Sequence, residues 1–361
     1  MNDPAPRSRR VVVVAQAFKG TLTMAQVANA LAAGVRAAGG DPVVLGGSDG
    51  GDGLLDALGS RLLRRTSHPA EDPLRRPISA EIGWLDPETA VVESRLACGL
   101  SLLAVDERAP GVTTTRGVGR LIGAAAAAGA RRVYVGLGGS ATMDGGVGMA
   151  RAWGWIPQDA AGRELAEGGG ALEDLAVLVP GTRPGVELVG LCDVRNPLTG
   201  DGGARVYAAQ KGASPRETDR LARGLERLAA VAGGQGTLAD TPGAGAAGGL
   251  GFGLLLFGGG TLRPGAEWVL RTVGLADALA RTALVVVGEG TFDHTSLEGK
   301  LTGEVIRRAA EVRVPTLLLA PRAAAVPDGV LVESGGGTWS AADLERRAGE
   351  AIDRALRLMA S

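Results

Sequence analysis

Five segments of the chain combine glycine with acidic, basic or hydroxyl side chains, which are the residue types that bind phosphates and metal ions. Each segment follows a short apolar run that we expect to be a β-strand. In open α/β sheets, ligands bind beyond the carboxyl ends of the strands. The sequence therefore predicts one ligand site built from strand ends. The segments are residues 15–20, 48–53, 136–146, 192–197 with 210–212, and 288–293 running to 299–300.

The first two segments supply a lysine and two carboxylates. Lys19 precedes an expected helix, where it can reach a phosphate or carboxylate together with the free N–H groups of the helix start. Asp49 and Asp52 flank two glycines. Two carboxylates about 4 Å apart repel by ~4 kcal/mol at an effective dielectric near 20. A site that brings both together therefore needs a cation, either Mg²⁺ or a lysine. A solvated lysine and an ordinary acidic turn are the alternative interpretations.

The third segment is typical of an anion-binding loop, because exposed N–H groups and hydroxyls follow a buried strand. Its glycine spacing from Gly136 to Ala141 also resembles a dinucleotide-binding fingerprint. That fingerprint needs a second strand with a terminal acid about twenty residues later, and none follows. The chain has no Walker A motif. The candidate anion ligands are Gly138, Gly139, Ser140 and Thr142.

The fourth segment contains a candidate base and two cations. Asp193 stands at an expected strand end, where its carboxylate can orient or deprotonate a substrate hydroxyl. Arg195 and Lys211 can hold an anion, and we place Asn196 with them as a binding residue. The alternative interpretation of this segment is an Asx-turn before Pro197.

The fifth segment offers hard oxygen ligands. Glu289 and Asp293 carry the carboxylates that suit Mg²⁺, and Lys300 stands at an expected helix start. His294 lies in the same segment, but one imidazole without a thiol or a second imidazole makes a poor metal site. The candidate metal ligands are thus Asp49, Asp52, Glu289 and Asp293.

Strands alternating with helices predict an α/β fold with a largely parallel sheet. Short segments between residues 62 and 93 indicate a strand-rich insertion, which suggests that one domain interrupts another. We expect a discontinuous domain of residues 1–68 plus 284–361 and an inserted domain of residues 69–283. The expected strands include residues 11–14, 42–45, 132–135, 187–191, 284–287, 316–319 and 330–333. The expected helices are residues 21–38, 117–128, 215–231, 265–280, 299–312 and 341–359, with a glycine-rich helix in 243–260.

Composition excludes several classes of protein. In 361 residues, 38 Lys+Arg balance 39 Asp+Glu, which removes the electrostatic footprint of a nucleic-acid binder. No apolar run approaches the ~18 residues of a membrane helix. Cys98 and Cys192 match no zinc or redox spacing. We therefore expect a cytoplasmic protein with small-molecule partners, no nucleic-acid or membrane partner, and we leave a homodimer open.

The ordered set of segments resembles the bacterial type I glycerate kinase family over nearly the whole chain. Any one segment is weak, but their order is specific. The stretches that carry the resemblance are residues 17–20, 49–53, 136–142 with 144–146, 192–194 with 196–198, 210–213, 242–251, 262–265, 288–290 with Asp293, and 299–300.

The resemblance implies two α/β domains, one of them Rossmann-like and discontinuous, with the active site in the cleft between them. It implies transfer of a phosphoryl group from ATP to D-glycerate with Mg²⁺ as cofactor, usually giving the 2-phosphate. Asp193 would then orient the acceptor hydroxyl and take its proton, with Lys19 as the second candidate catalytic residue. Lys211 and Lys300 would neutralise phosphate or carboxylate.

The chain departs from the family pattern at several loop positions. Gln16-Ala17 stand where Asp-Ser is usual, Met143 where Asn is usual, and Thr295-Ser296 where Gln and Thr or Ser are usual. Residues 320–322 are Ala-Pro-Arg where Ala-Gly is expected. These departures favour two alternatives to glycerate phosphorylation: a related hydroxy acid as substrate, or a kinase-fold binding protein that has lost its chemistry. The glycine spacing of the third segment motivates a third, a nicotinamide-dependent oxidoreductase.

Overall fold

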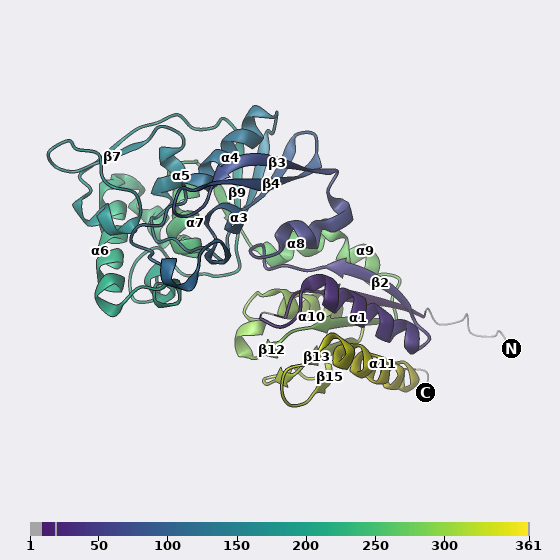
Figure 1. Cartoon of the computed structure of the whole chain (residues 1–361). Coiled ribbons are helices and arrows are strands. Elements are labelled where there is room, and N and C mark those ends of the chain that lie inside the picture. Colours follow the sequence, from purple (N-terminus) through teal and green to yellow (C-terminus); the bar gives the residue numbers. More distant parts are fainter. Residues whose placement is uncertain (1–8, 19, 360–361) are drawn as a thin grey trace. The chain divides into compact units, whose positions relative to one another are not determined.

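A computed structural model describes residues 9–18 and 20–359. The chain forms two compact units. Unit 1 comprises Met1–Asp49, Asp56–Arg61 and Ala266–Ser361, and unit 2 comprises Gly50–Leu55 and Leu62–Gly265. Both units are mixed α/β structures (Figure 1), so the predicted fold class is confirmed.

The bounds of the units differ from the predicted domain bounds at three places. Gly50–Leu55, expected in the discontinuous domain, belong to unit 2. Residues 62–68 belong to unit 2, because β3 (Arg64–Glu71) pairs along its whole length with β4 (Pro77–Asp86). Residues 266–283 belong to unit 1, because α8 (Gly265–Val273) places Ala266 and Leu270 in the apolar core of that unit. Residues 62–68 and 266–283 each belong to the unit against which they pack, and the amino-acid composition along the chain does not reveal such contacts.

A parallel sheet of five strands forms the centre of unit 1, in the order β15-β13-β11-β1-β2. Val11–Val14 are fully buried, as expected for a β-branched run covered on both faces. The strands are β1 (Arg10–Ala15), β2 (Asp41–Gly46), β11 (Leu284–Gly288), β13 (Thr316–Ala320) and β15 (Leu331–Ser334).

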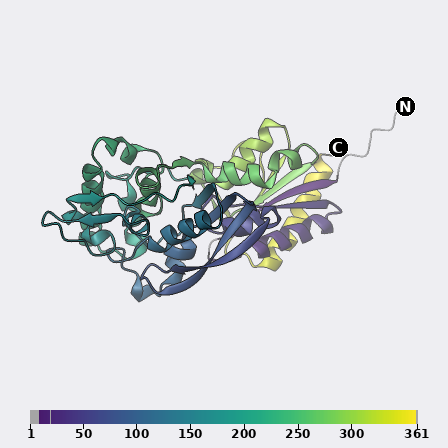
Figure 2. The same cartoon turned by 90° about the horizontal axis from the view of Figure 1, so that it is seen from above.

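Helices cover both faces of this sheet. One face carries Val11 and Val13 and packs against α1 and α11, while the other carries Val12 and Val14 and packs against α8, α9 and α10. Figure 2 shows purple α1 and yellow α11 on one side of the strands and the green helices on the other. The helices are α1 (Met24–Ala37), α9 (Leu275–Leu279), α10 (Leu301–Glu311) and α11 (Ala341–Leu358).

The chain leaves β1 and β11 in opposite directions. From β1 it passes through α1 to β2, and from β11 it passes through α10 on the other face to β13. The strand order therefore reverses between β1 and β11. Such a switch point leaves a crevice at the carboxyl ends of the two strands, where ligands bind in doubly wound sheets.

Unit 2 contains a six-stranded sheet in the order β10-β9-β6-β5-β4-β3. Its strands from β10 to β5 are parallel, and the β5–β4–β3 meander is antiparallel. The three meander strands lie in the segment that the sequence predicted to be rich in strands. The remaining elements include β5 (Thr89–Glu93), α4 (Arg116–Ala127), β6 (Arg132–Gly136), α5 (Val147–Arg151), β9 (Glu187–Leu191), α6 (Pro215–Val231), α7 (Ala246–Leu256) and β10 (Thr261–Arg263).

The backbone at the start of α7 is left-handed. Ala247, Gly248 and Gly249 all have positive φ, so the chain turns before the regular helix begins. Gly248 lies so close to the Thr142 carbonyl that a Cβ would be 1.8 Å from its oxygen. Only glycine combines this conformation with this approach. The glycine-rich helix entry predicted from the sequence is therefore a packing requirement of the loop that contains Thr142.

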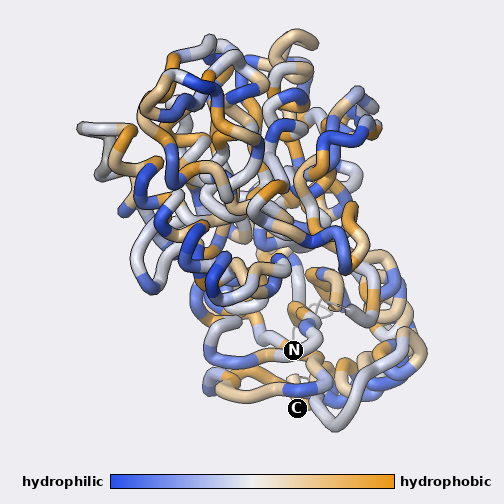
Figure 3. The backbone as a smooth tube through the Cα atoms, turned by 60° about the vertical axis from the view of Figure 1, so that its left-hand side comes forward, coloured by the Kyte–Doolittle hydropathy of each residue, from blue (hydrophilic) through white to orange (hydrophobic). Residues whose placement is uncertain are grey.

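Hydrophilic and apolar residues are interspersed along the tube of both units (Figure 3). Among the described residues, no helix has the length and apolar character needed to cross a membrane.

Two glycines of α4 give a matched test of the close packing of α4 against α5. A Cβ at Gly119 would lie 2.4 Å from the Met149 carbonyl oxygen, whereas a Cβ at Gly123 would meet nothing within 4 Å. Gly119→Ala should lower the free energy of unfolding by about 1–3 kcal/mol through overpacking. Gly123→Ala should raise it by about 0.5–1 kcal/mol, since alanine favours helix. Urea unfolding followed by circular dichroism measures both, and equal effects would contradict the packing of α4 on α5.

Candidate functional site

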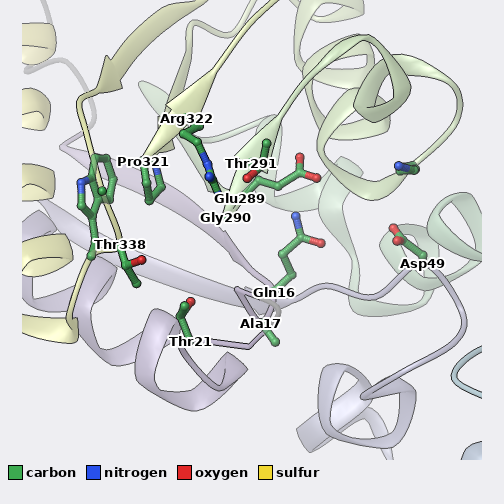
Figure 4. Close-up of a pocket in the computed structure, with 13 residues that line it drawn as sticks. Gln16, Ala17, Thr21, Asp49, Glu289, Gly290, Thr291, Pro321, Arg322 and Thr338 are labelled. Atoms are coloured by element: carbon green, nitrogen blue, oxygen red, sulfur yellow. The ribbon is translucent and has the colours of Figure 1, made fainter. Parts of the chain in front are cut away.

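A pocket of about 270 Å³ opens in unit 1 at the carboxyl ends of β1, β11 and β13 (Figure 4). It lies at the switch point of the sheet, where the α/β rule predicts a ligand. Acidic, basic and hydroxyl side chains line it together with one proline and one tryptophan. The lining residues are Gln16, Ala17, Thr21, Asp49, Glu289, Gly290, Thr291, Lys300, Pro321, Arg322, Gly337, Thr338 and Trp339.

Glu289 follows β11 directly and places its carboxylate in this pocket. Ser296 Oγ donates a hydrogen bond to Glu289 Oε1 (3.2 Å), while Oε2 is buried and has no hydrogen-bond partner. Burial raises the pKa of Glu289, and the nearby negative charge of Asp49 acts in the same direction. A buried carboxylate oxygen without a partner is costly unless a cation or a proton satisfies it.

Asp49 is the second carboxylate of the pocket. Its Oδ1 accepts a hydrogen bond from the backbone N–H of Leu301 (2.9 Å), so the loop after β2 is tied to the start of α10. Two carboxylates facing one pocket suit Mg²⁺, which typically takes one or two carboxylates and fills its other positions with water and phosphate oxygens. Among the described residues there is no group of three or more His, Cys, Asp or Glu side chains that could hold a metal ion. Asp49 and Glu289 therefore fit a metal ion that arrives with a phosphate ligand.

The other two acids predicted as metal ligands are engaged elsewhere. Asp293 Oδ1 accepts hydrogen bonds from the Thr295 N–H (2.8 Å) and hydroxyl (2.7 Å), which lower the pKa of Asp293 and cap the short turn His294–Leu297. Asp52 is exposed, belongs to unit 2, and lies 4.0 Å from Arg95 Nε. Of the four predicted acids, Asp49 and Glu289 line the pocket of unit 1 and Asp293 does not.

Lys300 and Gln16 complete the polar wall of the pocket. Lys300 Nζ donates to Thr295 Oγ1 (2.7 Å), and its positive charge opposes the rise in the pKa of Glu289. Gln16 Nε2 donates to the Gly288 carbonyl (3.2 Å) and to Thr302 Oγ1 (2.8 Å). The Gln16 side chain thus joins the end of β1 to the end of β11 and to α10. Lys19, predicted as a catalytic residue, lies outside the described residues.

The predicted anion loop of unit 2 contains a buried ammonium group. Lys211 is only 3% exposed, and its Nζ donates to Ser140 Oγ (2.8 Å) and to the Thr142 carbonyl (2.8 Å). Burial lowers the pKa of Lys211 to about 8. Thr142 Oγ1 is buried and has no hydrogen-bond partner. The structure therefore brings together three of the predicted binding residues and leaves one hydroxyl of the group unsatisfied.

Asp144 supports this loop from beneath. It is buried, and its carboxylate accepts hydrogen bonds from the N–H and hydroxyl of Thr115 and from the N–H groups of Gly146 and Gly148. Burial raises the pKa of Asp144, and these hydrogen bonds oppose the rise. Asp144 is not among the residues predicted from the sequence, although an acid directly before two glycines is the signal that could have found it.

Three candidate residues of the fourth segment, Asp193, Arg195 and Asn196, have different surroundings. Asp193 Oδ1 accepts from the Gly265 N–H (2.8 Å) at the start of α8. Arg195 is exposed. Asn196 donates to the Gly202 carbonyl (2.6 Å) and accepts from the Tyr207 hydroxyl (2.6 Å). The amide of Asn196 therefore stabilises its own loop. Gly138 packs against the backbone of Gly51, and Gly139 packs against the side chain of Asp52.

The dinucleotide fingerprint lacks its helix. A Rossmann phosphate loop runs directly into a helix whose N-terminus faces the phosphate. After β6 the chain instead passes through Ser140, which forms an isolated β-bridge with Gly99. The next helix begins only at Val147 and spans five residues. This arrangement does not support a nicotinamide-dependent oxidoreductase.

Comparison with known proteins gives a consistent result. The model of the "Glycerate kinase family" matches residues 11–361. The chain is 39% identical to a glycerate kinase of Bacillus subtilis (strain 168) and 36% identical to a glycerate 2-kinase of Escherichia coli (strain K12), each alignment covering 86% of this chain and 84% of the relative. It also resembles the crystal structure of a protein assigned as glycerate kinase 2 from Salmonella typhimurium LT2, with a TM-score of 0.82, 32% identity, and coverage of 98% of this chain and 99% of that one. The resemblance predicted from the ordered segments is confirmed.

The buried Lys211 predicts a pH dependence of stability. Its pKa is about 8 in the folded chain and about 10.4 when unfolded. Between these values the unfolded chain binds more protons at this residue, so Lys211 makes the free energy of unfolding rise with pH. In Lys211→Met this contribution is absent, and wild type should gain stability relative to the variant from pH 8 to pH 10 in urea unfolding.

A second measurement follows the titration of Lys211 in the wild-type protein, so it does not depend on the folding of a variant. The chain has three lysines, so NMR of ¹³Cε-labelled lysine gives few signals. We expect one of them to titrate near pH 8. A stability difference that stays constant with pH, together with no lysine signal titrating near pH 8, would contradict the buried ammonium.

Proposed function

The chain belongs to the glycerate kinase family, and on that premise we propose that it transfers the γ-phosphoryl group of ATP to D-glycerate, with 2-phosphoglycerate as the favoured product. The observation that carries this proposal is the pocket at the switch point of unit 1. There a buried, unpartnered oxygen of Glu289 and a second carboxylate, Asp49, face the same space as Lys300. That combination suits a magnesium ion with a polyphosphate.

In the proposed reaction, unit 1 binds the nucleotide. Phosphoryl transfer asks a protein mainly for positioning and for neutralisation of charge. Glu289 and Asp49 would hold Mg²⁺, which supplies positive charge to the phosphate oxygens when it is bound. Lys300, at the start of α10, adds a second positive charge beside N–H groups that favour anions.

Unit 2 binds the acid in this proposal. Lys211 and Ser140 present an ammonium and a hydroxyl, and Thr142 Oγ1 is a buried hydroxyl without a partner. These groups match a carboxylate, which accepts several hydrogen bonds at once. Asp193 remains the proposed group that orients the acceptor hydroxyl and takes its proton, and Arg195 remains a proposed binding residue. We further propose that the enzyme acts in the cytoplasm on small molecules.

The departures from the family pattern have structural partners in this chain. Gln16 links β1, β11 and α10, and Thr295 joins Asp293 to Lys300. Met143 is fully buried in the apolar core of unit 2. The fold therefore accommodates these three replacements with contacts of their own, and none of them leaves a gap in the described structure around it.

A coupled assay tests the proposed reaction. Purified protein with MgATP and D-glycerate should release ADP. If the product is 2-phosphoglycerate, added enolase should convert it without any further enzyme. A product that reaches enolase only after phosphoglycerate mutase is added would reject the 2-phosphate. No ADP release above background from folded protein would reject glycerate as the substrate, and L-glycerate and glycolate are the matched alternatives.

We further propose a ranking of the four predicted metal acids, supported by the presence of Asp49 and Glu289 in the pocket lining. Glu289→Gln should raise the Mg²⁺ concentration for half-maximal activity at least roughly tenfold, because loss of an outer-shell partner alone costs about 10–100-fold in metal affinity. Asp49→Asn should act in the same direction. Asp293→Asn and Asp52→Asn should have smaller effects, since these carboxylates bind Thr295 and Arg95. Equal effects of all four substitutions on the magnesium titration would contradict this ranking.

A further inference from the structure

We infer that Arg322, which nothing in the sequence patterns singles out as a ligand, binds the phosphates of the nucleotide in the pocket of unit 1 and sets the affinity for the phosphoryl donor. The inference rests on the proposed function, because it assumes that this pocket receives the donor. Its basis is a fixed backbone, a side chain that lines the pocket, and a guanidinium group without a partner among the described residues.

The backbone of Arg322 is held in place next to the candidate metal ligand. Strand β13 ends at Ala320, and β14 (Arg322–Ala323) then pairs in parallel with β12 (Thr291–Phe292). The Ala324 N–H donates to the Phe292 carbonyl (2.8 Å) and closes this pairing. Since β12 begins two residues after Glu289, the pairing seats Arg322 beside the carboxylate. Figure 4 shows Arg322 on the same side of the pocket as Glu289 and Thr291.

The preceding residue adds stiffness to this seat. Pro321 fixes its own φ and donates no hydrogen bond, and it forms part of the pocket wall. The side chain of Arg322 therefore extends from a short, paired segment and not from a free loop. A cation on a positioned backbone loses less freedom when it binds a ligand than a cation on a mobile one.

The guanidinium group of Arg322 is not neutralised by another described side chain. In the described part of the structure, no hydrogen bond or ion pair engages its guanidinium group, and the side chain is exposed toward the pocket. Two arginines of unit 1 outside the pocket are paired instead: Arg308 contacts Glu304 (2.7 Å), and Arg347 contacts Glu333 (2.8 Å). An unpaired guanidinium in a pocket that already holds two carboxylates indicates a ligand with more negative charge than the metal alone can neutralise.

A nucleotide polyphosphate fits this requirement better than a small carboxylic acid. One divalent ion balances Asp49 and Glu289, so the charges of the phosphates fall to Lys300 and Arg322. The planar guanidinium group also donates two parallel hydrogen bonds to phosphate oxygens, which an ammonium group cannot do. The single carboxylate of a hydroxy acid would leave one of these two cations unneutralised.

Steady-state kinetics of three variants test the inference. Arg322→Ala should raise KM for MgATP roughly tenfold or more, because hydrogen bonds between charged groups are about twice as strong as those between neutral groups. Arg322→Lys should recover part of this loss, since it keeps the charge and loses the paired hydrogen bonds. KM for glycerate should stay unchanged in both. Arg36→Ala is the matched control, because Arg36 is an exposed arginine at the end of α1 and does not line the pocket.

A binding measurement separates this inference from the proposed function. Calorimetric titration with MgADP needs no turnover, and Arg322→Ala should weaken binding by about the same factor as it raises KM for MgATP. If wild type binds MgADP but phosphorylates no glycerate, the proposed substrate fails and the Arg322 inference is still decided by this titration. Unchanged MgADP affinity in Arg322→Ala, or a rise in KM for glycerate alone, would overturn the inference.

Discussion

The parallel pairing of β1 with β11 is the constraint from which the pocket of unit 1 follows. Val11–Val14 lie in register with Leu284–Val287, and both runs are fully buried. Because the chain leaves the two strands toward opposite faces, their carboxyl ends separate and leave room for a ligand. Glu289 stands at the end of β11, so the same pairing places its carboxylate in the partly buried wall of this pocket. The raised pKa of Glu289 and its unpartnered oxygen are consequences of the sheet topology.

The two units meet the same chemical demand in different ways. In unit 1, partly exposed acids and cations line an open pocket and are available to a metal ion and a charged ligand. In unit 2, Lys211 is buried and bound to Ser140 and Thr142, with Asp144 holding the loop beneath them. The first arrangement suits a ligand that brings its own counter-ion, and the second holds an ammonium group in a buried hydrogen-bonded position beside Thr142, whose hydroxyl has no partner. All three lysines of the chain lie in the segments that the sequence predicted to bind ligands.

Local patterns in the sequence predicted the elements of the fold well. The β-branched run after residue 10 became β1, and the predicted helix 215–231 has the bounds of α6, because Ser214 caps it and Pro215 occupies its first turn. Glycine-and-acid strand ends also located Glu289, Asp49 and the Ser140 loop. These signals are local: a buried strand, a cap and a strand end each leave a mark within a few residues.

Contacts between distant segments were beyond such patterns. Asp49 and Asp52 are three residues apart yet belong to different units, and Asn196 is occupied by Tyr207 and by a backbone carbonyl. Arg322 enters the pocket only because β14 pairs with β12, some thirty residues away in the chain. An exposed arginine after a proline carries no sign of that pairing in the sequence.

We propose that Glu289 and Asp49 hold a divalent ion for the nucleotide. The most direct measurement is a crystal structure with a non-hydrolysable ATP analogue and Mn²⁺ in place of Mg²⁺, with the ion located by anomalous scattering. We expect an anomalous peak in the pocket of unit 1, from an ion coordinated by Glu289 and by phosphate oxygens. A nucleotide bound with its metal away from this pocket, with the Glu289 carboxylate still unpartnered, would contradict it.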